Sequence, residues 1–162
     1  MTGTDPWESA RERMVATQIA ARGVGDEQVL AAMRRVPRHL FVPAEVRGSA
    51  YSDYPLPIGH GQTISQPYIV AMMTSLLQIQ PDDHLLEIGS GSGYQAAVLG
   101  ILAREVISIE RIPEVAQLAR KNLADAGITN VTVVIDDGTL GFPGGAPYDG
   151  VLITAATPSI PS

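Results

Sequence analysis

The feature that most constrains the fold is an apolar run that ends abruptly in glycines at alternate positions, within residues 82–93. The run from Leu85 to Ile88 predicts a buried strand, and helical spacing returns over residues 94–102. Glycine permits positive φ angles and lets a ligand approach the backbone closely. The glycines are Gly89, Gly91 and Gly93. Because the helix that follows directs its free N–H groups into the same crevice, we expect a small-molecule cofactor at the carboxyl end of this strand.

The spacing of these glycines differs from the dinucleotide-binding fingerprint. That fingerprint needs a glycine three positions after the second one, and Tyr94 occupies this place when the pattern is read from Gly89. The observed pattern is Glu-x-Gly-x-Gly-x-Gly and begins at Glu87. A tight strand–helix turn without any ligand is the alternative interpretation, since a doubly wound α/β protein can place glycines after a strand for packing alone.

Two acidic residues belong to the same predicted edge of the sheet. Glu110 ends an apolar run over residues 106–109, about 20 residues after the glycines, where an acid can accept both ribose hydroxyls of a nucleoside. A solvated charge at a strand end is the alternative. Glu87 lies inside an apolar strand, where an unpaired carboxylate would be costly. We expect Glu87 to accept backbone N–H bonds from the glycine loop or to meet the ammonium group of a ligand.

Composition excludes several classes of function. A chain of 162 residues with 45% apolar and 17% charged residues predicts one globular domain. The formal charge of −6 argues against a general nucleic-acid binder and against binding to an anionic membrane. There is no cysteine, no run long enough to span a membrane and no signal-like N-terminus, so we expect a cytoplasmic protein. No metal site is predicted, because the histidines lack ligand spacing and are expected at the surface or in loops: His39, His60 and His84.

Residues 1–60 predict a helical N-terminal cap over a cofactor-binding core at 61–162, together forming one structural domain. Capping residues and prolines delimit two helices, over 5–21 and 26–36. The rest of the cap is expected to be irregular, with an extended connector at 38–43 and a loop at 51–58.

The segment 59–67 is unusually rich in Gly, Ser, Thr and Gln for a connection between two apolar regions. It precedes a helix that should begin at Pro67 and run through Leu77. We interpret the segment as a lid over the glycine turn. For Ser65, the competing explanation is that this residue or Gln66 caps the helix.

Beyond residue 82 the pattern reads β–α–β–α–β–β, which predicts parallel strands joined by helices. A helix starts at Pro113, and further strands are expected at 131–135 and 148–153. Asp137, at the tip of the third strand, could accept a hydrogen bond from an adenine amino group. An Asp-Gly turn explains the same residue equally well.

Several segments, taken in order, resemble the protein-L-isoaspartate (D-aspartate) O-methyltransferase family of class I S-adenosylmethionine-dependent methyltransferases. They are residues 36–43, 61–67, 86–94, 107–111, 137–138, 146–149 and 154–156. The glycine motif is shared by many methyltransferases, whereas the loop Gly-Gln-Thr-Ile-Ser-Gln-Pro at 61–67 is far more specific. The resemblance implies a Rossmann-like, doubly wound and mostly parallel sheet.

The resemblance also implies an activity. The methyl donor would be S-adenosyl-L-methionine, and the acceptor would be the free carboxylate of an L-isoaspartyl residue in a damaged protein or peptide. Because that carboxylate is already ionised at neutral pH, no strong general base is needed. Ser65 would lie beside the acceptor as the catalytic residue. The implied cofactor-binding residues are Thr63, Ile64, Ser65, Glu87, Gly89, Ser90, Gly91, Gly93, Glu110, Asp137 and Gly138.

Two departures from the family pattern stand out. Asp136 replaces a common glycine, and the chain ends at Ser162 after four predicted strands, where such sheets have about seven. We therefore expect a C-terminally truncated core with an exposed sheet edge. Two other functions stay open: a methyltransferase acting on an aspartate of a dedicated peptide in natural-product maturation, and a non-catalytic cofactor-binding module. The sequence does not define an oligomeric state.

Overall fold

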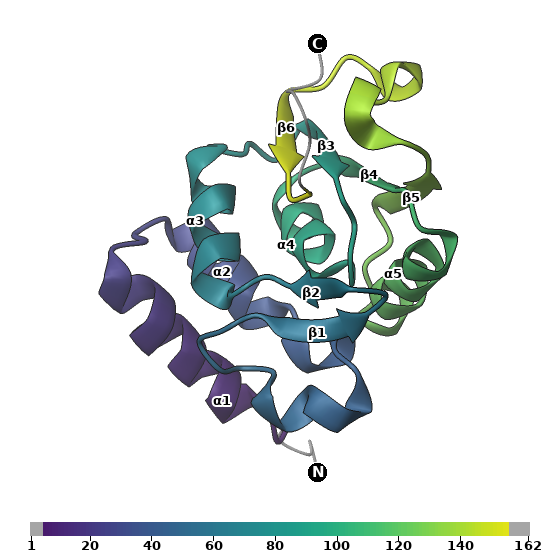
Figure 1. Cartoon of the computed structure of the whole chain (residues 1–162). Coiled ribbons are helices and arrows are strands. Elements are labelled where there is room, and N and C mark those ends of the chain that lie inside the picture. Colours follow the sequence, from purple (N-terminus) through teal and green to yellow (C-terminus); the bar gives the residue numbers. More distant parts are fainter. Residues whose placement is uncertain (1–4, 156–162) are drawn as a thin grey trace.

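A parallel four-stranded sheet forms the centre of the computed structural model, which describes residues 5–155 (Figure 1). The strands are β3 (His84–Ile88), β4 (Glu105–Glu110), β5 (Val131–Ile135) and β6 (Gly150–Ile153). They confirm the predicted α/β architecture, although β6 begins two residues later than expected. The end of the predicted core, residues 156–162 with Ala156 of the family motif, lies outside the described residues.

The order of the strands creates a switch in direction beside β3. Neighbours in the sheet run β5-β4-β3-β6, so the chain moves outward from β3 to β5 and then returns to the other side of β3. In open α/β sheets, ligands bind at the carboxyl ends of the strands near such a point. The glycine loop follows β3 and therefore lies at the expected place.

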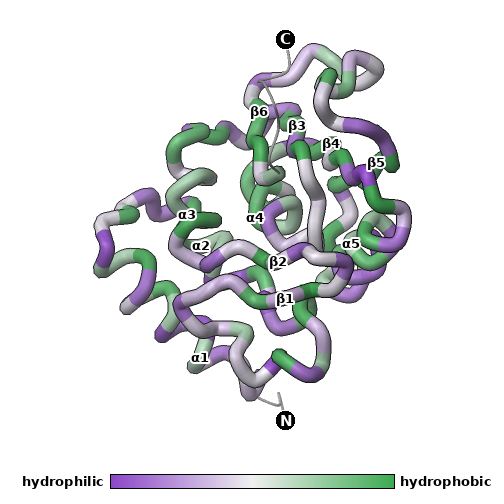
Figure 2. Tube along the Cα trace, viewed as in Figure 1, coloured by the Kyte–Doolittle hydropathy of each residue, from purple (hydrophilic) through white to green (hydrophobic). Residues whose placement is uncertain are grey.

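Three helices cover one face of the sheet. Helices α4 (Tyr94–Leu102) and α5 (Pro113–Asp125) follow β3 and β4, and α3 (Pro67–Leu76) packs beside α4. The opposite face carries Leu86, Ile88, Ile107 and Ile109, which pack against Phe142 and Tyr148 of the connection between β5 and β6. The two central strands, β3 and β4, are buried on both faces, and their inner residues are apolar except for Glu87 and Ser108. Figure 2 colours the chain by hydropathy.

The N-terminal helices form part of the same core. Helix α1 (Glu8–Met14) continues as a π-helical turn and a 3-10 turn before it ends at Gly23, where φ is +100°. Helix α2 (Glu27–Arg35) is capped by Asp26, whose carboxylate accepts from two backbone N–H groups. Both helices match the prediction. Buried apolar side chains from α1, α2, α4 and α5 belong to one cluster, so cap and core share their interior.

Two expectations about the irregular part of the cap are wrong. The connector at 38–43 is extended only at Val42 and Pro43, because Arg38–Phe41 forms a 3-10 turn in which the Leu40 N–H donates to the Pro37 carbonyl. The expected loop and lid instead contain an antiparallel hairpin, β1 (Leu56–Gly59) and β2 (Gln62–Ile64). The side chains of Leu56, Ile58 and Ile64 are buried and anchor the hairpin in the core. The predicted boundary at residue 60 falls in the hairpin turn, and the division into cap and core stays a prediction.

Individual side chains also differ from expectation. Leu76 of α3, an apolar residue that helical spacing would place on the buried face, is 76% exposed. His39, expected at the surface, is buried, stacks on Trp7 and faces the hydroxyl of Tyr51. His84 is half-buried and stacks on Tyr148. The spacing of apolar residues and the positions of the histidines in the sequence did not predict these environments.

Gly93 supplies a test of how the first turn of α4 is packed. It has φ +90°, and a Cβ there would lie 3.2 Å from the backbone oxygen of Ala119 in α5. We expect Gly93→Ala to lower the free energy of unfolding by about 1–3 kcal/mol in urea denaturation, through backbone strain and this contact. Gly48→Ala is the matched control, because its Cβ would meet nothing within 4 Å. Equal effects of the two changes would contradict the proposed packing role.

Candidate functional site

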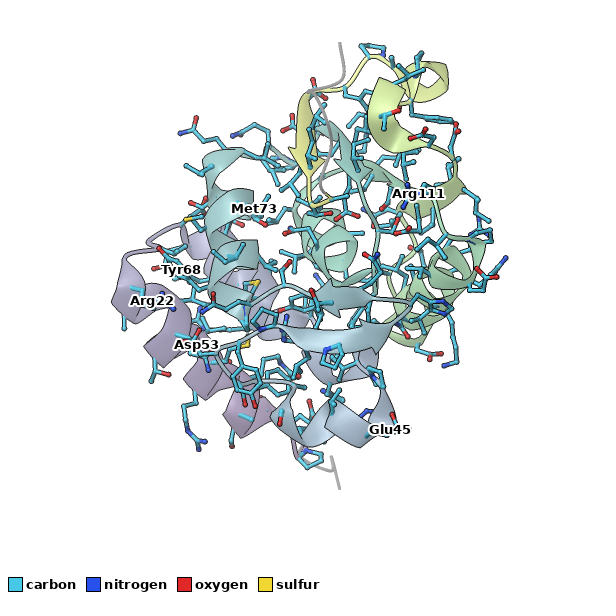
Figure 3. The ribbon with its side chains drawn as sticks, viewed as in Figure 1. Arg22, Glu45, Asp53, Tyr68, Met73 and Arg111 are labelled. Carbon is cyan, nitrogen blue, oxygen red and sulfur yellow. The ribbon has the colours of Figure 1, made fainter. Side chains whose placement is uncertain are left out.

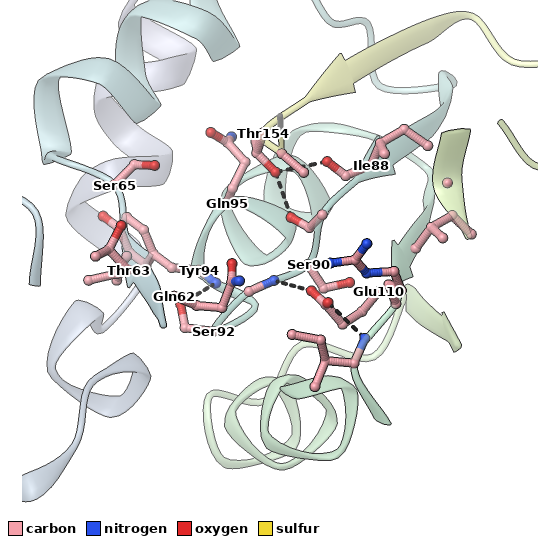
Figure 4. A pocket seen from close by; sticks show the side chains of 18 of the residues that line it. Gln62, Thr63, Ser65, Ile88, Ser90, Ser92, Tyr94, Gln95, Glu110 and Thr154 are labelled. Atoms are coloured by element: carbon pink, nitrogen blue, oxygen red, sulfur yellow. Dashed lines mark hydrogen bonds between the residues drawn. The ribbon is translucent and has the colours of Figure 1, made fainter. Parts of the chain in front are cut away.

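A pocket of about 380 Å³ opens at the carboxyl ends of β3 and β4, beside the β1–β2 hairpin (Figure 4). Its volume lies within the range of small-molecule sites. The hairpin, the glycine loop, the tip of β4 and the chain after β5 and β6 all contribute to its wall. The predicted site residues that line it are Thr63, Ile64, Ser65, Gly89, Ser90, Gly91, Glu110, Asp137 and Gly138. Glu87 and Gly93 lie behind this wall.

The glycine loop has the backbone geometry that the sequence indicated. Gly89 has φ +96°, and a Cβ there would lie 2.8 Å from the Cβ of Ala155, so a side chain would collide with the segment after β6. Gly91 has φ +52°, and its Cβ would meet only a side-chain methyl of Ile58, at 3.9 Å. Gly89 is therefore required by the packing of the protein itself, whereas Gly91 leaves open space on the pocket side.

Glu110 joins the glycine loop to the tip of β4. One oxygen of its carboxylate accepts from the Gly91 N–H at 3.0 Å, and the other accepts from the Ile112 N–H at 3.1 Å. The side chain is buried, yet it lines the pocket. Each carboxylate oxygen retains a further lone pair, so the group is held in place and can still accept a hydrogen bond from a ligand.

Glu87 differs from Glu110 in position and in hydrogen bonding. It is fully buried, and one of its oxygens accepts from the Ser108 hydroxyl, which in turn contacts the hydroxyl of Ser90. The other oxygen has no partner among the described residues. The expectation that Glu87 accepts N–H bonds from the glycine loop is wrong, because Glu110 takes the Gly91 N–H. Burial raises the pKa of Glu87 to about 8, so its carboxyl group is largely protonated at neutral pH.

The hairpin brings Ser65 to the pocket wall. Its hydroxyl has no hydrogen-bond partner within residues 5–155, and Figure 4 shows it beside Thr63. The capping explanation is wrong, because Gln66 is the N-cap of α3 and neither side chain makes a cap bond. The Gln66 amide instead donates to Asp53, at 2.6 Å.

A small polar cluster surrounds that bond. Asp53 also pairs with Arg22, whose guanidinium carbon lies 4.0 Å from the ring centre of Tyr68 (Figure 3). These contacts attach the segment just after Ser65 to the N-terminal helices.

Asp137 caps the 3-10 turn Gly138–Leu140, which confirms the turn that the sequence offered as one of two explanations for this residue. Its carboxylate accepts from the Thr139 N–H at 3.0 Å, and this bond holds its pKa below the ordinary value. The residue is also exposed at the pocket, so the turn does not exclude contact with a ligand. A Cβ on the adjacent Gly138 would lie 2.6 Å from a methyl group of Ile88, which explains the glycine.

The pocket contains polar residues that sequence reasoning did not assign to it, including Gln62, Tyr94, Gln95, Arg111 and Thr154. Several of them belong to the motif segments and could have been found there. Gln95 lies outside these segments. Its side-chain amide donates to the hydroxyl of Thr74 in α3, at 2.8 Å, and no pattern in the sequence indicates this contact. Thr154 donates its hydroxyl to backbone carbonyls at the end of β3.

Residues 5–155 contain neither a cluster of metal-ligating side chains nor a helix that could span a membrane. No cluster of three or more acidic or histidine side chains there could hold a metal ion. No helix in this part of the chain has the length and apolar character needed to cross a membrane.

The raised pKa of Glu87 predicts a pH-dependent stability. Between about pH 4.5 and pH 8 the folded state keeps a proton that the unfolded state releases, so the free energy of unfolding should fall as pH rises through this window. Glu87→Gln removes this dependence. The free energy of unfolding of the Glu87→Gln variant, relative to that of the unchanged protein, should therefore increase towards pH 8, by up to about 5 kcal/mol.

Urea denaturation from pH 5 to pH 8.5 measures this difference. Glu45→Gln, a change at an exposed carboxylate, controls for surface charge. A stability difference between Glu87→Gln and the unchanged protein that does not vary with pH would show that Glu87 is ionised in the folded state.

Comparison with known proteins places this arrangement in a family. Residues 9–162 match the family model described as Protein-L-isoaspartate(D-aspartate) O-methyltransferase (PCMT). A protein-L-isoaspartate O-methyltransferase of Methanoculleus marisnigri is 61% identical over 97% of this chain and 71% of its own length. One of Methanoregula boonei is 59% identical over 99% of this chain and 74% of its own length.

Solved structures agree with these relatives. A protein-L-isoaspartate O-methyltransferase matches with a TM-score of 0.84 and 29% identity, over 93% of this chain and 50% of that protein. A Plasmodium falciparum protein described as a putative protein-L-isoaspartate O-methyltransferase, in complex with S-adenosyl-L-homocysteine, matches in fold with a TM-score of 0.79 and 22% identity, over 93% of this chain and 76% of its own. The chain therefore belongs to the protein-L-isoaspartate (D-aspartate) O-methyltransferase family.

Proposed function

We propose that this chain transfers the methyl group of S-adenosyl-L-methionine to the free carboxylate of L-isoaspartyl residues in damaged proteins or peptides. The family is S-adenosylmethionine-dependent. The observation that carries the proposal is the meeting, in one pocket, of the Ser65 hydroxyl with the glycine loop and Glu110. The hydroxyl belongs to the specific motif at 61–67, and it has no hydrogen-bond partner within the described chain.

The residues present fit this cofactor. The open side of Gly91 leaves room for a ligand against the backbone, and Glu110 offers fixed acceptor oxygens for ribose hydroxyls. Asp137 and Gly138 would contact the adenine, and Thr63 and Ile64 would cover the cofactor from the hairpin. When bound, S-adenosyl-L-methionine supplies a sulfonium with an activated methyl group.

The chain's own residues then have a limited task. The acceptor carboxylate is already ionised, so Ser65 need only donate a hydrogen bond that fixes the position of this carboxylate. Holding two reacting groups in line can recover roughly 7–11 kcal/mol of an activation barrier. A serine hydroxyl without other partners is suited to this positioning.

The charge state of the site supports an anionic acceptor. A second carboxylate beside the glycine turn would repel it, but Glu87 is largely protonated at neutral pH. Glu110 remains an acceptor whose oxygens already receive two backbone N–H bonds. The protein behind the pocket wall therefore carries less negative charge than the sequence indicates.

An assay with labelled donor tests the activity. We expect methyl transfer to a peptide that contains an L-isoaspartyl residue, and no transfer to the same peptide with ordinary aspartate. Transfer to the aspartyl peptide alone would favour natural-product maturation. Binding of S-adenosyl-L-homocysteine in calorimetry without any turnover would favour a non-catalytic binding module. The cytoplasmic location stays a prediction.

Replacement of Ser65 tests its assigned role. We expect Ser65→Ala to lower kcat by about 10- to 100-fold, the effect of losing one hydrogen bond to a charged group. The Kd of S-adenosyl-L-homocysteine in calorimetry should change by less than about threefold. Ser52→Ala, a change of the same type in the cap, is the control. A loss of cofactor affinity as large as the loss of kcat would mean that Ser65 holds the cofactor and not the acceptor.

A further inference from the structure

Arg38 is the largest fully buried side chain of the described residues, and it carries a positive charge. It lies in the 3-10 turn after α2, a segment for which the sequence suggested only a connection. None of the ion pairs within residues 5–155 involves it, so no carboxylate neutralises the guanidinium. Burying an unpaired cation costs free energy, and this cost needs a compensating role.

The guanidinium donates hydrogen bonds to backbone carbonyls of two separate segments. Nε donates to the carbonyl of Ala50 at 2.6 Å, and one terminal nitrogen donates to the carbonyl of Ser65 at 2.9 Å. The other terminal nitrogen has no partner within the described chain. A planar guanidinium fixes the directions of its N–H groups relative to one another, so the two carbonyls are held in a defined relation.

A third contact connects Arg38 to the cofactor side of the pocket. Its guanidinium carbon lies 4.8 Å from the ring centre of Tyr94, the first residue of α4 after the glycine loop. Tyr94 is buried and contributes to the pocket wall. One side chain of the N-terminal cap therefore contacts both the serine segment and the first residue of α4.

The buried side chain of Ile64 anchors the hairpin just before Ser65, whereas Ser65 and Gln66 themselves have fewer contacts. The Ser65 hydroxyl is unbound within the described chain, and the next residue, Gln66, is held by Asp53 at the surface. The bond from Arg38 to the Ser65 carbonyl is a part-buried hydrogen bond that fixes the Ser65–Gln66 peptide unit. Loss of this bond would loosen the backbone at the Ser65 Cα, from which the hydroxyl is carried.

We propose that Arg38 is a positioning residue for methyl transfer, which acts through the Ser65 backbone to aim the Ser65 hydroxyl at the acceptor carboxylate. The inference rests on the proposed function for its kinetic consequence. Arg38 does not line the pocket and need not touch substrate or cofactor. Because misplacement of a reacting group by about 1 Å can cost about 100-fold in rate, a loosened serine segment should affect kcat more than cofactor binding.

Arg38→Lys, which keeps the charge but loses the planar fork, is the first variant. We expect kcat for an isoaspartyl peptide to fall by about 10- to 100-fold, with the Kd of S-adenosyl-L-homocysteine changed by less than about threefold. Arg38→Gln, which is neutral and keeps an amide donor, is the second variant should the lysine not fold. Met14→Ala truncates another fully buried side chain of the cap and should lower Tm without lowering kcat of the folded protein.

A double-mutant cycle with Ser65→Ala separates positioning from general stability. If Arg38 acts through the serine hydroxyl, Arg38→Lys should lower kcat by less than about threefold once the hydroxyl is absent. If the kcat of the double variant falls by the product of the losses in the two single variants, the proposal is overturned. A loss of kcat in Met14→Ala as large as that in Arg38→Lys would overturn it as well.

Hydrogen exchange provides a measure that needs no activity. In Arg38→Lys the backbone amides within residues 61–68, other than the proline at 67, should exchange at least about tenfold faster, while those of α5 keep their protection. Unchanged exchange at 61–68 would overturn the proposal. If the unchanged protein transfers no methyl group, the proposed function fails, and the exchange result still decides whether Arg38 holds this segment.

Discussion

The architecture of the site depends on the left-handed backbone of the glycine loop. Positive φ angles at Gly89, Gly91 and Gly93 let the chain leave β3 and enter α4 within a few residues. The same turn allows the segment after β6 to approach Gly89, lets Gly93 pack on α5, and presents the Gly91 N–H to Glu110. A side chain at Gly89 or Gly93 would collide with parts of the protein that jointly form the pocket.

The acidic residues around this turn are stabilised in different ways. Glu110 accepts backbone N–H bonds, Asp137 caps a 3-10 turn, and Glu87 is protonated because burial outweighs its hydrogen bond from Ser108. Only the first two residues face the pocket. This division matters for the proposed reaction, in which a negatively charged acceptor must approach without a further ionised group beneath the turn.

The N-terminal cap is part of the machinery that shapes the pocket. Its helices share an apolar cluster with α4 and α5, and the hairpin that follows it brings the motif at 61–67 to the glycine loop. Arg38 connects these elements through backbone carbonyls and the ring of Tyr94. The Ser65 carbonyl is thereby bonded to a residue far from it in the sequence, while the opposite wall of the pocket comes from the ends of the sheet strands.

The sequence by itself determined the strands β3, β4 and β5, the helices with clear capping residues or prolines, and the glycine turn, because these depend on local spacing and backbone freedom. It did not reveal the hairpin at 56–64 or the 3-10 turn at Arg38, since short segments with prolines have ambiguous local preferences and owe their conformation to burial in a distant core. The raised pKa of Glu87 and the buried contacts of Arg38 were also decided only by the tertiary structure. Both follow from the exclusion of water by side chains and backbone groups remote in the chain, and no local pattern encodes that.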